Sequence, residues 1–286
     1  MKPQFDNEVM SSFYLWFDHT LTNVGEAYTN YGSLFYPVNN MYQAYSTYGS
    51  PFRQFVADAS ITGATILSGV YLNSDFKERT ESNFTGVNYG LGQVYFTSSV
   101  DTSTTKISGD YAIKDFNIFL TNQTEEKLLF ETQFTINNKI ANDPTGLPPD
   151  SLTYPAIFLK NMGGTNEPFA FGGEDQTSVN TRAIVIADNQ FTLDATCSIF
   201  RDTSKDYIGI LSAAEMPFNN LGDFTNYSNY NYTGITNSKI GTDSSIFVDN
   251  VNISKIGGAS FAGISNVNPN TYSALIDFEL KKIRIP

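Results

Sequence analysis

The last fourteen residues, SALIDFELKKIRIP, constrain the fold of this chain more than any other segment. Apolar residues recur there at every second position and then resume one position out of step: Ala274, Ile276, Phe278 and Leu280, then Ile283 and Ile285. This period predicts one strand over 273–286. The offset at Lys281 and Lys282 predicts a β-bulge. A strand of this length needs a partner edge, either within the chain or on a neighbouring subunit.

The composition favours strands and turns over helices. Charged residues make up only 16% of the 286 residues, whereas about a quarter is usual for globular proteins. The chain has 23 Phe and 17 Tyr, and aromatic side chains suit a pleated sheet. We therefore expect a β-rich α+β fold, in one large domain or two ordinary ones.

The N-terminal segment differs from the rest of the chain. Apolar residues spaced three and four apart predict a helix over 7–28, within an N-terminal arm of residues 1–30. The following stretch, 31–50, loses this period and is rich in tyrosine and turn residues. It is either a long connection or a loop that contacts another subunit, because tyrosine is enriched at interfaces. The candidate interface residues there are Tyr42, Tyr45 and Tyr48.

Two further regions follow. Period-two stretches at 65–73, 92–99, 106–120 and 127–136 predict a β-sandwich or barrel-like domain over 31–140. Residues 141–152, rich in proline and glycine, predict a linker.

The second domain, 153–286, is predicted to mix strands with one packed helix. Strands are expected at 154–161, 181–188, 246–257 and 273–286, a helix at 189–207 and a long loop at 213–245. Cys197 would lie on the buried face of this helix, with Leu193 and Phe200.

The residues that carry most enzyme chemistry are scarce. His19 is the only histidine and Cys197 the only cysteine, so a Cys/His metal site and an internal disulfide are excluded by number. The carboxylate pairs Glu174/Asp175 and Asp110/Asp115 match ordinary turn and strand positions. We therefore expect no catalytic residues, no cofactor and no metal.

Charge and hydropathy limit the partners. The net charge of −12 argues against unaided binding to a phosphate backbone. No apolar run reaches the ~18 residues of a membrane span, and the start, MKPQFDNEVMSS, has no hydrophobic signal core. We expect neither a membrane anchor nor secretion.

The order of segments in the second half resembles the tail-terminator and neck proteins of tailed bacteriophages. The segments are YPAIFLKN, then TRAIVIADNQFTLDATCSIFRDTS, then SALIDFELKKIRIP. The aromatic, charge-poor stretches of the first half, such as FYLWFDHTLTNVGEAYTNYGSLFYPV, resemble virion structural proteins of contractile-tailed phages.

The resemblance implies a virion subunit without catalysis, assembled in the host cytoplasm into a ring, commonly a hexamer, between head and tail. Its partners would be other copies and other neck and tail proteins, and DNA would pass through without being gripped. Strand addition across subunits would place an interface at Phe278, Leu280, Lys281, Lys282, Ile283, Arg284 and Ile285.

An alternative function remains open from sequence alone. The tyrosine-rich segments 31–50 and 224–236 could stack on sugar rings in a carbohydrate- or receptor-binding module.

Overall fold

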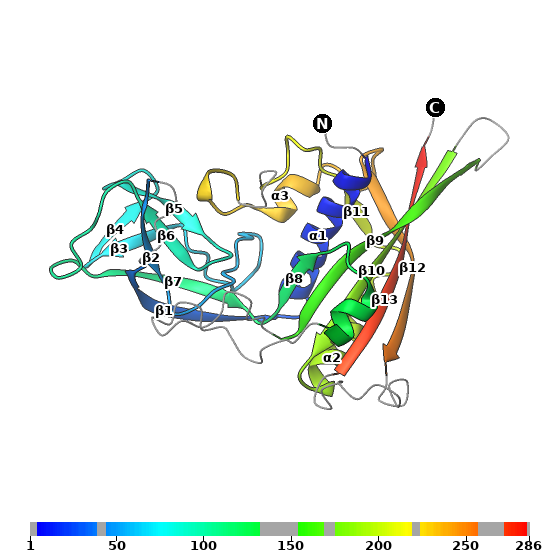
Figure 1. Cartoon of the computed structure of the whole chain (residues 1–286). Helices are drawn as coiled ribbons and strands as arrows, with labels where there is room; N and C mark the ends of the chain where they lie inside the picture. Colours follow the sequence, from blue (N-terminus) through cyan, green and yellow to red (C-terminus); the bar gives the residue numbers. More distant parts are fainter. Residues whose placement is uncertain are drawn as a thin grey trace.

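The fold is described from a computed structural model, which covers residues 5–38, 44–131, 154–168, 175–218, 224–256 and 272–284. The described chain forms two lobes side by side, each built on one sheet, with the N-terminal helix between the second sheet and the first lobe (Figure 1). The fold is β-rich α+β, as the composition predicts.

The first lobe is a seven-stranded sheet with the order β4-β3-β7-β1-β2-β6-β5. Its strands are β1 (Tyr28–Pro37), β2 (Ser46–Gly49), β3 (Gly69–Leu72), β4 (Asp75–Glu78), β5 (Phe84–Asn88), β6 (Gln93–Phe96) and β7 (Ile107–Lys114). The two outermost strands, β4 and β5, are consecutive in the chain, and the turn between them is closed by a hydrogen bond from Thr80 N to Phe84 O. The sheet is therefore barrel-like.

The second lobe is a six-stranded sheet with the order β11-β12-β13-β10-β9-β8. Its strands are β8 (Asn117–Leu120), β9 (Ala156–Pro168), β10 (Asp175–Ala187), β11 (Tyr207–Gly209), β12 (Ser245–Ile256) and β13 (Tyr272–Arg284). All described pairings are antiparallel except that of β8 with β9.

Two helices, α1 (Phe5–Asn23) and α2 (Gln190–Arg201), cover one face of this sheet. Aromatic rings from both helices meet Phe278 at the centre of β13: Phe13, Trp16, Phe17 and Phe200 have ring centroids 5.1 to 6.1 Å from it. The other face is covered in part by the short π-helix Lys127–Glu131, whose Leu128 packs against Ile184 and Ile186. Both faces of the second sheet are therefore covered by helices over part of their area.

The prediction for α2 is confirmed. Asn189 caps the helix by accepting a hydrogen bond from Thr192 N. Leu193, Cys197 and Phe200 are buried on one face. The helix ends at Arg201, six residues before the predicted end at 207.

Three predicted boundaries are wrong. The N-terminal helix ends at Asn23 instead of residue 28, and a side chain at Gly25 would collide with the Leu21 carbonyl. The stretch 31–50 contains most of β1 and all of β2 instead of a loop. The predicted strand 127–136 begins as a π-helix in its described part.

The division into domains also differs from the prediction. The segment 106–120 is two strands, β7 and β8, that belong to different sheets. The N-terminal helix packs on the second sheet, so residues 1–30 are not a separate arm where they are described. The predicted linker 141–152 lies outside the described residues. The loop 213–245 includes the short helix α3 (Tyr232–Thr236).

Candidate functional site

The C-terminal strand finds both of its partner edges within the chain. β10 pairs with β13 without interruption from Tyr272 to Arg284. β12 pairs with the other edge from Ser273 to Lys281. The prediction that this strand completes its hydrogen bonds on a neighbouring subunit is therefore wrong over 273–281.

The predicted bulge at Lys281-Lys282 is also wrong, because the bulge lies on the adjacent strand. Val248 pairs with Leu280 and Asn250 with Glu279, so Asp249 is the extra residue of β12. The bulge brings the Asp249 carboxylate within 2.6 Å of Lys281 Nζ and 2.9 Å of Lys205 Nζ. The Lys281 and Lys205 ammonium groups lower the pKa of Asp249.

Most predicted interface residues of β13 are buried or make contacts within their own chain. Phe278 is 1% and Leu280 0% exposed, so neither offers surface to a second subunit. The Lys282 ammonium lies 5.7 Å from the centre of the Phe5 ring. Ile283 and Arg284 pair with the backbone of β10. Ile285 lies outside the described residues.

The tyrosines of the predicted interface loop are also mostly internal. Tyr48 is buried, and its hydroxyl donates to Val100 O at 3.0 Å. Tyr45 is half-buried with its ring against Tyr95 and Tyr227. Tyr42 lies outside the described residues. Sequence reasoning missed these contacts because they join residues far apart in the chain.

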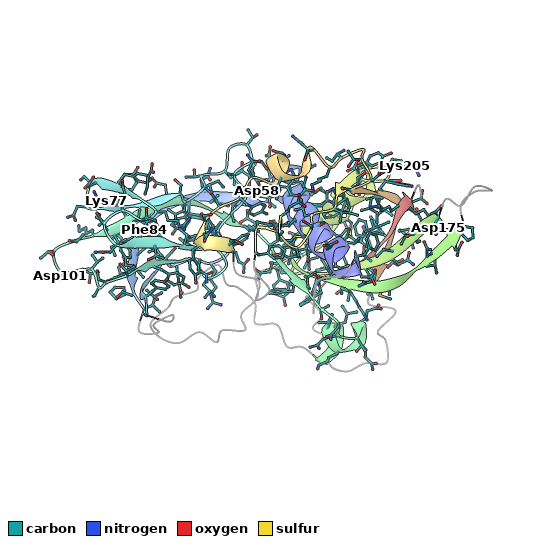
Figure 2. The ribbon with its side chains drawn as sticks, turned by 90° about the horizontal axis from the view of Figure 1, so that it is seen from above. Asp58, Lys77, Phe84, Asp101, Asp175 and Lys205 are labelled. Carbon is teal, nitrogen blue, oxygen red and sulfur yellow. The ribbon has the colours of Figure 1, made fainter. Side chains whose placement is uncertain are left out.

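A β-arm projects beyond the helices at the end of the second lobe (Figure 1). It is formed by the distal halves of β9 and β10 with the last residues of β13. Every residue of β9 from Asn161 to Pro168 is exposed. Asp175 lies at the far end of the molecule, opposite Asp101 and Lys77 (Figure 2). Among the described strands, β9 has the longest run of consecutive exposed residues.

The outer edge of the arm carries features that discourage strand addition. β8 pairs with β9 only as far as Leu159. Beyond it, Met162 is an extra residue opposite Asn180 and Thr181, and Gly163 N donates to Asn161 Oδ1 at 2.7 Å. β9 ends at Pro168, which has no N–H. A bulge and a proline are common protections of a free edge.

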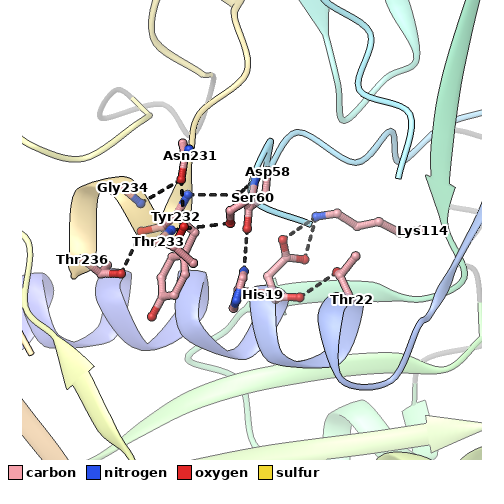
Figure 3. Close-up of polar contacts among 11 residues, drawn as sticks. His19, Thr22, Asp58, Ser60, Lys114, Asn231, Tyr232, Thr233, Gly234 and Thr236 are labelled. Carbon is pink, nitrogen blue, oxygen red and sulfur yellow. Dashed lines mark hydrogen bonds and ion pairs between the residues drawn. The ribbon is translucent and has the colours of Figure 1, made fainter. Parts of the chain in front are cut away.

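A polar network joins the two lobes (Figure 3). His19 Nδ1 lies 2.7 Å from Asp58 Oδ2, and the His19 ring stacks on Tyr232 with centroids 4.4 Å apart. Asp58 Oδ1 accepts from Tyr232 N, Ser60 N and Ser60 Oγ. Burial raises the pKa of Asp58, but these hydrogen bonds outweigh it and leave the pKa below its ordinary value.

The second part of the network is a buried ion pair. Lys114 Nζ of β7 lies 2.6 and 2.7 Å from the two carboxylate oxygens of Asp18 on α1. Both residues are buried. The pair ties the first sheet to the helix that covers the second.

The geometry of this network is that of a structural joint. In a serine triad the hydroxyl bonds to the histidine, but Ser60 bonds to Asp58. Each carboxylate of the network already receives hydrogen bonds or an ion pair from α1, β7 or α3. Among the described residues, no group of three or more His, Cys, Asp or Glu side chains could hold a metal.

The candidate carboxylate pairs do not converge. Asp115 accepts from Thr29 at the start of β1, whereas Asp110 lies beside Gly32 farther along the same strand pair. Asp175 is on the arm, and Glu174 lies outside the described residues.

The comparisons with known proteins are negative. No protein-family model matches this chain, and no curated protein matches it significantly. Within the described ranges, none of the helices has the length and apolar character required to cross a membrane.

Proposed function

We propose that this protein is a structural subunit that acts by self-association, as part of a ring at the neck or tail end of a tailed-phage particle. The ring would be built in the host cytoplasm and remain in the virion. Other copies of the chain and neighbouring neck and tail proteins would be its partners. DNA would pass through it without specific contacts.

The β-arm is the observation that carries this proposal. In the arm, β9 exposes every residue from Asn161 to Pro168, whereas the paired part of β10 is half-buried at 175–178 and buries Val179, so the free surface of the arm lies mainly on β9. Asn166 donates to Asp175 and accepts from Thr177, which links β9 to β10 within the arm. An exposed, projecting pair of strands is suited to reach an adjacent subunit.

The order of elements supports the family part of the proposal. Two long strands, a helix that follows the second strand directly and a closing strand are β9, β10, α2 and β13. This order carries the resemblance to tail-terminator proteins. Because β13 is paired on both sides along most of its length, the subunit contact is assigned to the faces of the arm.

We expect the purified protein to form a discrete homo-oligomer that depends on the arm. Replacing Thr165 and Glu167 by lysine places two positive charges on one exposed face of the arm. These charges would repel each other across a contact between subunits, so the dissociation constant of the oligomer should rise at least about tenfold. Light scattering after size-exclusion chromatography measures the mass, and negative-stain electron microscopy tests for a ring.

The matched control replaces Thr102 and Glu78 by lysine, which makes the same change of charge at exposed positions of the other lobe. The control should assemble like the unmodified protein. A monomer at high concentration, or equal weakening in both variants, would contradict the proposal.

A second candidate is binding of carbohydrate, and one surface favours it. Phe76, Tyr71 and Leu34 lie in a row across β4, β3 and β1, with Ser108 of β7 between the last two. All three are exposed, as is Tyr36 nearby on β1. Exposed apolar patches commonly mark interaction sites. The tyrosines of segment 224–236 are less suitable, since Tyr230 and Tyr232 are buried.

If this row binds glycans, replacing Tyr71 and Phe76 by alanine should abolish the signal on a glycan array. Tyr272→Ala is the control, because Tyr272 is similarly exposed but lies on the other lobe. An array without any bound glycan counts against this candidate and leaves the assembly proposal unaffected.

A further inference from the structure

A cavity of about 670 Å³ lies between the two lobes. Its wall combines Tyr14 of α1, residues of β5 and the turn after it, and β8 of the second sheet. Phe218, Phe224 and Tyr227 line another side. Ligand pockets of proteins commonly measure about 300–1,000 Å³ and often lie between domains.

Aromatic rings dominate the wall. Among the described residues, six rings line the cavity: Tyr14, Tyr89, Phe119, Phe218, Phe224 and Tyr227. Some already meet edge to face, with 6.3 Å between the centroids of Tyr14 and Phe218 and 5.7 Å between those of Tyr89 and Phe224. None of the described lining residues is Asp, Glu, Lys, Arg or His. Burial of a charged ligand here would be unfavourable.

Several polar groups of the wall are already satisfied. The Tyr89 hydroxyl donates to Leu67 O. Asn88 donates to the Tyr95 hydroxyl and accepts from Leu91 N. Burial raises the pKa of Tyr14, so its hydroxyl stays protonated and can donate. Few polar groups of the wall therefore remain to orient a ligand. They include the Tyr14 hydroxyl and the side-chain amide of Gln54.

The backbone at the cavity is strained. Gln54 and Tyr227 both line it and both have positive φ, 61° and 52°. Such conformations are uncommon outside glycine. Gly86 of β5 packs against Tyr227, where a side chain would come within 2.6 Å of the Tyr227 carbonyl. Strained residues cluster at ligand sites more than elsewhere.

We propose that this cavity binds a neutral, largely apolar small molecule with a planar ring system and one or two hydrogen-bonding groups. The rings would contact its faces, while Tyr14 and Gln54 would orient its polar group. This site is separate from the arm and goes beyond the assembly role.

The test uses N-phenyl-1-naphthylamine, a neutral probe with a naphthyl group, a phenyl group and one N–H, which fluoresces in apolar surroundings. We expect saturable fluorescence with one site per chain. Leu91 lines the cavity and Ile240 does not, and each is 44% exposed. Leu91→Arg should weaken binding at least about tenfold, since it brings a charge to the cavity, whereas Ile240→Arg should leave affinity within about twofold.

A second matched pair guards against a variant that fails to fold. Leu120→Arg acts on another side of the cavity, and Tyr207→Arg is its control, with both residues 51% exposed. Circular dichroism selects the folded variants. No saturable fluorescence with the unmodified protein, or equal effects of cavity and control variants, would overturn the proposal.

Discussion

Replacing Phe278 by alanine is expected to lower the free energy of unfolding by about 3–5 kcal/mol. Phe278 is 1% exposed at the centre of β13. Its ring meets rings of α1 and α2, including Phe13 at 5.1 Å and Phe200 at 5.8 Å. Truncation would remove this buried area and leave a cavity that helices packed on a rigid sheet could fill only in part.

Urea unfolding followed by the fluorescence of Trp16 measures this loss, because Trp16 contacts the Phe278 ring. Phe191→Ala on α2 is the control: Phe191 is 84% exposed, so its loss should change stability by less than about 0.5 kcal/mol. A Phe278 variant that keeps full stability but assembles poorly would contradict the buried position and restore an interface role for this residue.

Replacing Lys114 by methionine is expected to destabilise the protein by about 3–5 kcal/mol. The change removes the ammonium that lies 2.6 Å from the Asp18 carboxylate and leaves a buried charge without its partner. Because the pair joins β7 to α1, the loss should affect both lobes together. Urea unfolding monitored by circular dichroism and by Trp16 fluorescence measures it.

The double variant Asp18→Leu/Lys114→Met separates the charge from the packing. Replacement of a buried ion pair by apolar side chains is often neutral or stabilising, so the double variant should recover most of the lost stability. If the double variant is as unstable as Lys114→Met alone, the uncompensated Asp18 charge is not the cause.

Several local features could be predicted from the sequence because nearby residues determine them. Asn189 and the spacing of Leu193, Cys197 and Phe200 specify α2 by its cap and its apolar face. The alternation of Ala274, Ile276, Phe278 and Leu280 specifies a strand with one buried face. The abundance of aromatic residues and the low charge favour a β-rich fold.

Prediction from local patterns failed where a short run of residues is compatible with two different structures. The segment 127–136 alternates like a strand, yet its described start is a π-helix that packs Leu128 on the second sheet. The segment 106–120 looks like one long strand, but the chain turns after Lys114 and enters the other sheet at Asn117. A period describes which side chains face together and leaves open which sheet they join.

The candidate sites were even less accessible to sequence reasoning. Asp18 and Lys114 are 96 positions apart, and the cavity combines residues from Tyr14 to Tyr227. No local signal relates such positions, since their proximity follows from how the lobes pack. The arm is recognisable only when β9 and β10 are seen to continue beyond the helices.

The sequence by itself determined that β13 would be a long strand with an apolar face, because alternation along a strand is a local property. Only the tertiary structure decided which edges it would pair with. β10 and β12 occupy those edges, and α1 and α2 cover the face of β13 that carries Phe278. Backbone hydrogen bonds are the same for any partner strand. The pairing of β13 is therefore determined by the burial of side chains over the whole lobe.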